Sequence, residues 1–211
     1  MLFRSDGPAG RIEGILDGTT ENPRAAVVFA HPHPLLAGGG TMHTKAVFQG
    51  MKGLTRIGCA VLRFNFRGVG LSAGTWDEGR GELLDFSAAV DAMAARYPGL
   101  DIWAAGFSFG SYVALTAGAS DDRVCALIGI APPVDRYDFD AARQSTKAKF
   151  LVHGESDELI PLRAVRDLYA RMADPKELVE IDRANHLFEG QATEVGDALE
   201  DLLGDFTCRT P

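Results

Sequence analysis

Short β-rich runs alternate along the chain with longer stretches whose apolar residues recur at helical spacing. The β-rich runs are AAVVFA (25–30), CAVLRFNF (59–66), DIWAAGF (101–107), VCALIGIA (124–131), KFLVHG (149–154) and ELVEID (177–182). Helical spacing predicts helices over 42–58, 81–97, 108–119, 161–173 and 193–206. RIEGIL (11–16) instead alternates polar and apolar residues, which predicts a half-buried edge strand of a hairpin.

The repeated strand–helix alternation predicts an α/β fold with a mostly parallel sheet and helices on both of its faces. The sequence contains no internal repeat, no low-complexity segment and no linker. We therefore expect residues 1–211 to form a single domain. In sheets of this kind, reactive groups gather in the loops at the carboxyl ends of the strands.

Two serines match the pattern G-x-S-x-G, which marks the nucleophile of many hydrolases. Ser108 in GFSFG directly follows the strand predicted over 101–107 and directly precedes a helix, as the motif requires. Ser72 in GLSAG lacks both neighbours, because Arg67-Gly68-Val69-Gly70 follow the preceding strand and TWDEGRG after it is turn-like. We therefore interpret Ser108 as the candidate nucleophile and the segment around Ser72 as a glycine-rich surface loop.

A serine hydroxyl needs a base, usually histidine, and the histidine needs a carboxylate that orients it. His186 lies between the last predicted strand and the last helix, so it comes late in the chain, in the order Ser…Asp…His. For the acid we favour Asp157, a few residues past the strand predicted over 149–154, although Glu155 in the same turn stays an alternative. A structural alternative for Asp157 is that it caps the helix that begins near Pro161.

The loop after AAVVFA reads His31-Pro32-His33-Pro34, and its backbone is a candidate donor to an oxyanion. Because proline has no N–H, only His31 and His33 can donate there, and we favour His33. The second donor is expected to be the N–H of Phe109, the residue after the nucleophile. His31, His33 and His43 could also suggest zinc, but prolines interrupt them and no acidic or thiol ligand lies nearby. We expect neither metal nor cofactor.

Composition narrows the possible partners. The 29 acidic and 21 basic residues give a net charge of −8, without the clustered Lys and Arg that nucleic-acid binding needs. No apolar run approaches the roughly 18 residues that span a bilayer, and the N-terminal segment lacks a signal-peptide core. Cys59, Cys125 and Cys208 form no C-x-x-C pair, so buried free thiols in a reducing compartment are expected. We expect a cytoplasmic protein that binds neither nucleic acid nor membrane.

The motifs together resemble the α/β hydrolases, and in particular a small bacterial group of that superfamily. The resemblance rests on HPHP (31–34), RFNFRGVGLSAG (63–74), GFSFG (106–110), HGESD (153–157) and NHLF (185–188), in this order over nearly the whole chain. It implies an α/β-hydrolase fold with Ser108 as nucleophile, His186 as base and Asp157 as acid. It also implies backbone oxyanion donors at His33 and Phe109. Members of the group are described mostly as predicted hydrolases or esterases, so no substrate is inherited.

Many α/β hydrolases carry a cap in the region of residues 132–148, but this segment is too short for a cap domain, so an open cleft is expected. Candidate pocket residues are apolar, without an evident Arg or Lys: Leu35, Met42, Phe109, Pro133, Ile160, Leu187 and Phe188. We expect a carboxylesterase for small, neutral, short-acyl esters. The alternatives are a peptidase, thioesterase or lactone hydrolase that uses the same residues, and a binding scaffold without catalysis.

Overall fold

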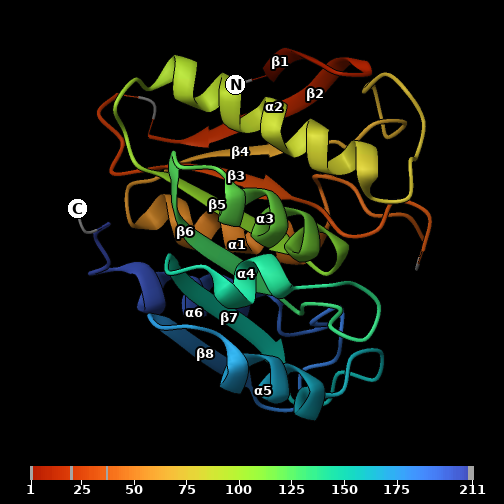
Figure 1. Ribbon diagram of the computed structural model, residues 1–211, viewed down its shortest axis with the longest axis vertical. Helices are drawn as coiled ribbons and strands as arrows, with labels where there is room; N and C mark the ends of the chain where they lie inside the picture. The colour runs from red at the N-terminus through yellow and green to blue at the C-terminus, as the bar shows by residue number, and fades with distance from the viewer. Residues whose placement is uncertain (1, 20, 37, 209–211) are drawn as a thin grey trace.

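The strands of the chain form one sheet in a computed structural model that describes residues 2–19, 21–36 and 38–208. Across these residues the sheet has eight strands in the order β1-β2-β4-β3-β5-β6-β7-β8 (Figure 1). Strands β3 to β8 pair in parallel, whereas β1–β2 and β2–β4 are antiparallel. This is the mostly parallel α/β sheet that the alternation of elements predicts.

Apart from β1, which no run predicts, the strand bounds follow the predicted runs closely. In chain order they are β1 Leu2–Gly7, β2 Gly10–Gly18, β3 Ala26–Ala30, β4 Ala60–Phe64, β5 Ile102–Phe107, β6 Val124–Ile130, β7 Ala148–Gly154 and β8 Lys176–Ile181. The residues of β3, β4, β5 and β7 are all buried, as expected of parallel strands that are covered on both faces.

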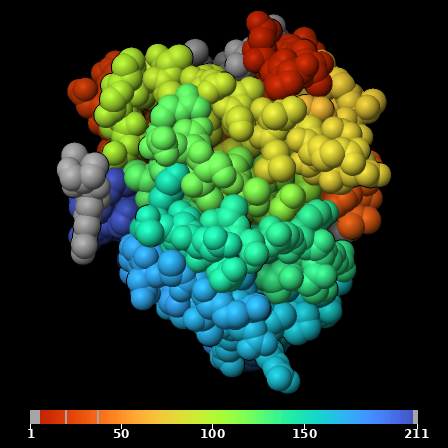
Figure 2. Space-filling view, in the orientation of Figure 1, coloured from red at the N-terminus to blue at the C-terminus, as the bar shows by residue number. Residues whose placement is uncertain are grey.

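Helices cover both faces of the sheet. They are α1 Lys45–Arg56, α2 Arg80–Arg96, α3 Phe109–Ser120, α4 Asp140–Gln144, α5 Leu162–Arg171 and α6 Ala192–Leu203. Helices α2 to α5 lie on the face toward the viewer in Figures 1 and 2, and α1 and α6 lie behind the sheet. Two apolar cores result, one on each face. Among the described residues, no helix has the length and apolar composition that crossing a bilayer requires.

Two details of the sheet differ from the prediction. The alternating burial of β2 is as expected, but β2 is an internal strand, and β1 forms the edge. The β1 sequence LFRSDG contains two charged residues and no clear alternation of polar and apolar residues. The sequence pattern therefore gives little indication of a strand there. Between β6 and β7 the chain forms only the five-residue helix α4 and its flanking loops, which confirms the expected absence of a cap.

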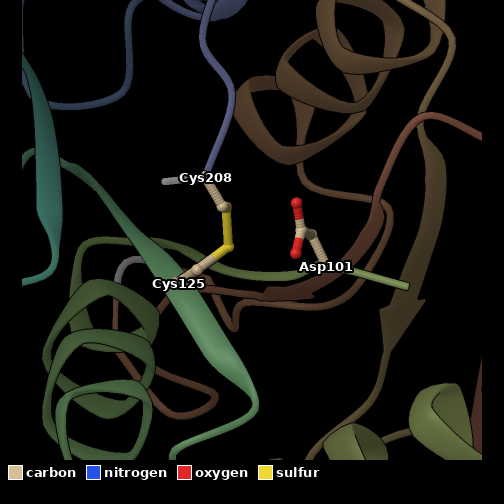
Figure 3. Close-up of side chains that lie close together, drawn as sticks. All are labelled: Asp101, Cys125 and Cys208. Carbon is tan, nitrogen blue, oxygen red and sulfur yellow. A yellow bond between two sulfur atoms is a disulfide. The ribbon is translucent and has the colours of Figure 1, made fainter. Parts of the chain in front are cut away.

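The expectation of three free thiols is wrong, because Cys125 and Cys208 form a disulfide (Figure 3). Only Cys59 is free and buried. The bonded cysteines are 83 positions apart in the sequence, so no local pattern indicates the pairing. The packing of Phe206 against Trp103 and Phe150 brings the C-terminal segment back to the start of β6. Since disulfides persist mainly in oxidising compartments, the cysteines no longer support a cytoplasmic location.

Candidate active site

Ser108 occupies a strained turn between β5 and α3. Its backbone has φ 52° and ψ −120°, in a region that side-chain-bearing residues rarely adopt. The turn is possible because its neighbours are glycines: a Cβ on Gly106 would collide with the carbonyl of Gly110, and a Cβ on Gly110 would lie 2.5 Å from the carbonyl oxygens of Ala30 and His31. The close packing places the half-buried Ser108 beside the end of β3.

His186 connects Ser108 to Asp157. Its Nε2 lies 3.0 Å from the Oγ of Ser108, and its Nδ1 lies 2.7 Å from Oδ2 of Asp157. The two contacts join residues 78 and 29 positions apart in the chain. The side chains of Asp157 and His186 are 0% and 6% exposed, so water competes little with the hydrogen bond between them. The structure thus brings together the three residues that the sequence singles out for catalysis.

The turn after β7 holds Asp157 in its ionised form. Oδ1 accepts hydrogen bonds from the N–H groups of Leu159 at 2.9 Å and Ile160 at 2.8 Å, which leaves Oδ2 for His186. Burial alone would raise the pKa of Asp157, but the hydrogen bonds from His186 and Ile160 outweigh it, and the pKa lies below its usual range. Glu155, the alternative acid, has an exposed side chain, and the carboxylate that bonds to the His186 ring is Asp157. Glu158 contacts His186 only at its backbone N–H, which it accepts at 3.3 Å.

His153 stabilises the turn after β7 that carries Asp157. It is fully buried, and its Nε2 donates a hydrogen bond to the carbonyl of Ile160 at 2.9 Å. Burial is the main cause that lowers the pKa of His153. Its Nδ1 has no partner among the described residues. The histidine of the HGESD motif therefore fixes the segment that positions Asp157, a role that the sequence alone does not indicate.

The loop after β3 lies against the start of α3. The rings of His33 and Phe109 are 5.5 Å apart, and Trp76 contacts both rings. Phe109 is the first residue of α3, where a helix leaves its N–H groups unpaired. Within the described part of the chain, no acceptor is found for the backbone N–H of either His33 or Phe109. Both groups therefore remain available to a ligand.

His31 fixes this loop through both ring nitrogens. Nε2 accepts a hydrogen bond from the N–H of Phe66 at 3.1 Å, so Nδ1 carries the proton and donates to the carbonyl of Pro32 at 2.6 Å. Burial lowers the pKa of His31 to about 4, which keeps the imidazole neutral at ordinary pH. His31 is thus a structural anchor for the loop that carries His33.

The free energy of unfolding is expected to fall as the pH falls from about 6.5 to about 4. The unfolded chain binds a proton at the ordinary His31 pKa of 6.5, whereas the folded chain resists protonation down to about 4. Acid therefore favours the unfolded state, with a contribution from His31 of roughly 3 kcal/mol over this range. Urea denaturation at several pH values should show a shallower decline for His31→Gln than for the wild type. Equal declines would contradict this role.

The RFNFRGVGLSAG segment has a structural role: its side chains connect the segments that surround the site. Arg63 donates to Asp17 and to the carbonyl of Met42, and Asn65 accepts the N–H of Met42 at 3.0 Å. Arg67 forms a bidentate pair with the buried Asp85 of α2. These bonds connect the end of β4 to the segment before α1 and to α2. The sequence marks the motif, but its partners become visible only in the fold.

Ser72 takes part in the same network of hydrogen bonds. Its hydroxyl donates to the carbonyl of Asn65 at 2.7 Å and accepts the N–H of Glu13 at 3.0 Å. Ser72 is only 8% exposed, so the prediction of a surface loop is accurate for the glycine-rich segment but not for the serine itself. The Ser72 hydroxyl thus uses its proton and one lone pair in hydrogen bonds to the backbone. This structural role explains the serine without any reactivity.

A cavity of about 310 Å³ opens beside Ser108 and His186. Of the predicted pocket residues, Phe109, Pro133, Ile160 and Leu187 line it. The prediction is wrong for Leu35, a residue that is 67% exposed, and for Met42 and Phe188, which are buried and do not line the cavity. The remaining walls include Leu36, Tyr137 and Leu159.

Three charged residues, Lys45, Arg136 and Glu189, also line the cavity. The expectation of a pocket without Lys or Arg is therefore wrong. Lys45 begins α1 and Arg136 lies in the loop after β6, so neither is close to the catalytic motifs in the sequence. Only the packing of these segments around Ser108 brings the charges to the site.

His31 of the HPHP loop offers no free ring nitrogen to a metal, because both of its nitrogens are bonded to the backbone. Among the described residues, the one cluster with metal-ligand spacing is Asp101, Cys125 and Cys208 (Figure 3). The two sulfurs of this cluster are bonded to each other, so they offer no thiolate to a cation.

The comparisons with known proteins agree with this fold. The family described as "Serine aminopeptidase, S33" (Hydrolase_4) matches residues 21–148. An α/β serine hydrolase homologue from Coxiella burnetii is 35% identical, with a TM-score of 0.88 and coverage of 96% of this chain and 97% of that one. The chain belongs to the α/β-hydrolase superfamily.

Two further proteins are similar to this α/β hydrolase. An α/β serine hydrolase without a lid from Xanthomonas campestris is 32% identical, with a TM-score of 0.90 over 100% of this chain and 96% of that chain. An uncharacterized protein from Rickettsia prowazekii is 35% identical over 208 residues, which is 94% of this chain and 86% of that protein. The first similarity agrees with a hydrolase fold that has no cap.

Proposed function

We propose that this α/β hydrolase cleaves small carboxylic esters through an acyl-enzyme on Ser108. The observation that carries the proposal is the continuous contact from Asp157 through His186 to Ser108, at 2.7 and 3.0 Å, beside an open cavity. A serine, a histidine and a carboxylate in this geometry are the components of nucleophilic acyl transfer.

In the proposed mechanism, His186 Nε2 takes the proton of Ser108 as Oγ attacks the carbonyl carbon of the ester. The same histidine then gives this proton to the leaving alcohol, and the acyl group stays on Ser108. Water, activated by His186, hydrolyses the acyl-enzyme and restores the serine. Asp157 holds Nδ1 protonated and stabilises the imidazolium that forms transiently.

The tetrahedral intermediates of both steps carry a negative oxygen, which needs donors that are already in place. We assign this role to the backbone N–H groups of Phe109 and His33. Both are free of acceptors within the described residues, and they belong to segments that pack together at Gly110. Because Phe109 opens α3, the helix dipole also favours negative charge at this point.

The cavity supports a small acyl group. Its volume of about 310 Å³ lies at the lower end of the range of small-molecule sites, and its walls are largely apolar. With no cap between β6 and β7, no additional surface is available to cover a long chain. We therefore expect butyrate-sized esters to be better substrates than long-chain esters.

The matching family is described as a serine aminopeptidase, which makes peptide hydrolysis the second candidate. An aminopeptidase site must bind a protonated α-amino group, and among the described lining residues the one carboxylate is that of the exposed Glu189. Lys45 and Arg136 line the same cavity and would repel an ammonium group. The charges of the cavity thus favour esters over free peptide N-termini.

A substrate panel tests the proposed function. We expect purified protein to hydrolyse 4-nitrophenyl acetate and butyrate with higher kcat/KM than the octanoate and palmitate esters, and leucine 4-nitroanilide to be turned over slowly or not at all. Butyryl thioesters and a small lactone complete the panel. Preference for the anilide, the thioester or the lactone would replace the ester assignment, and no turnover of any of them would favour a binding scaffold.

A further inference from the structure

Lys45 and Arg136 stand out because the protein as a whole is acidic. The chain has a net charge of −8, yet the charged side chains that line the catalytic cavity are two cations and one carboxylate, Glu189. Neither cation forms an ion pair with any of the described residues. Within the part of the chain that the structure describes, no carboxylate therefore forms an ion pair with either cation.

The loop that carries Arg136 is held in a definite position. The N–H groups of Arg136 and Tyr137 both donate to the carbonyl of Pro133, about one helical turn earlier in the chain. All three residues line the cavity. The Tyr137 ring stacks on Tyr112 at 4.4 Å and contacts Phe109 at 5.6 Å. The packing fixes the backbone of Arg136 beside the cavity, whereas the acidic neighbours of Arg136 in this loop, Asp135 and Asp138, are not part of the lining.

The two cations face the cavity from different elements. Arg136 lies in the loop after β6 and lines the same cavity as His33 of the HPHP loop. Burial and, to a smaller extent, the charge of Arg136 lower the pKa of His33. Lys45 is the first residue of α1, where the helix dipole disfavours a positive charge, and no acidic residue in that turn compensates it. Lys45 is exposed at this position, and a ligand with a negative charge would offset the unfavourable interaction of its charge with the helix dipole.

We propose that the physiological substrate is an anionic ester, whose carboxylate or phosphate is bound by Arg136 and Lys45 while its acyl carbonyl lies at Ser108. This inference rests on the proposed esterase function and narrows its substrate class. The apolar walls formed by Leu36, Leu159 and Ile160 accommodate the part of the substrate between the charge and the reacting carbonyl. An arginine and a lysine together suit a carboxylate or phosphate, which accepts several charged donors.

Matched ester pairs test this proposal. One pair places the charge on the acid side, mono-(4-nitrophenyl) adipate against its neutral methyl ester. The other places it on the leaving group, 3-carboxy-4-nitrophenyl butyrate against its methyl ester. We expect kcat/KM to be higher for the anionic member of at least one pair. This preference should decline in about 1 M NaCl, where the screening length falls to about 3 Å.

Arg136→Gln and Lys45→Gln should each lower the ratio of anionic to neutral kcat/KM by about fivefold, the size expected for an exposed charge contact. Lys52→Gln in α1 and Arg143→Gln in α4 remove the same charge outside the cavity and should leave the ratio unchanged. A ratio at or below one in both pairs, or a ratio that neither cavity variant lowers, would overturn the proposal. Neutral esters hydrolysed through Ser108 would then leave the esterase function intact, whereas no hydrolysis of any ester would overturn both.

Discussion

Substitution of Ser108 by alanine is expected to lower kcat for short-chain ester hydrolysis by about 10⁴- to 10⁶-fold, because it removes the atom that would form the acyl-enzyme. The Oγ of Ser108 is the group that His186 contacts at 3.0 Å, and no other hydroxyl shares this contact among the described residues. Alanine removes only one oxygen and leaves the backbone of the turn, so the protein should fold. Initial rates with 4-nitrophenyl butyrate measure the effect.

Ser72→Ala is the matched control for this variant, since both serines satisfy G-x-S-x-G. It should retain ester hydrolysis, because the Ser72 hydroxyl bonds to Asn65 and to the N–H of Glu13 rather than to the site. Loss of these buried bonds should instead lower the free energy of unfolding by about 1–3 kcal/mol. An inactive but stable Ser72→Ala protein, or an active Ser108→Ala protein, would contradict the assignment.

Asp157→Asn is expected to lower kcat by about 10⁴-fold while the fold is kept. The asparagine Oδ1 can still accept the N–H groups of Leu159 and Ile160, as Oδ1 of Asp157 does. Its Nδ2 would then face Nδ1 of His186, in place of an oxygen that lies 2.7 Å away. Two donors cannot share one hydrogen bond, so His186 would turn to the tautomer that is protonated at Nε2. In that tautomer His186 cannot take the proton of Ser108.

Glu155→Gln is the control for Asp157→Asn. Glu155 lies in the same turn as Asp157, and the substitution removes the same negative charge. Its exposed side chain should make the change nearly neutral for kcat. Rates for the two variants, with circular dichroism to confirm the fold, separate the roles of the two carboxylates. A larger loss for Glu155→Gln than for Asp157→Asn would assign the acid to Glu155.

The sheet and the three proposed catalytic residues could be predicted from the sequence because their signals are local. A buried parallel strand is a continuous β-rich run, and Ser108, Asp157 and His186 each follow such a run at the edge where parallel strands end together. The rule that reactive groups gather there connects positions 78 residues apart without any knowledge of contacts. The predicted order of motifs therefore gave the same three residues that the structure brings into contact.

The walls of the cavity could not be predicted in this way, because side-chain direction in loops has no period. Phe188 follows His186 closely, but its positive φ of 53° turns the ring into the core, 6.0 Å from the Phe107 ring. Met42 has its backbone bound by Arg63 and Asn65 and its side chain buried. Arg136 and Lys45 reach the site only through the packing of a loop and a helix that carry no motif.

Covalent labelling of the nucleophile tests whether Ser108 is the activated serine. A fluorophosphonate probe phosphonylates an activated serine, and peptide mass spectrometry locates the modified residue. We predict one modified site, Ser108 in the peptide that contains GFSFG, with labelling abolished in Ser108→Ala and kept in Ser72→Ala. Labelling at Ser72, or no labelling of folded wild-type protein, would contradict Ser108 as the activated nucleophile of this α/β hydrolase.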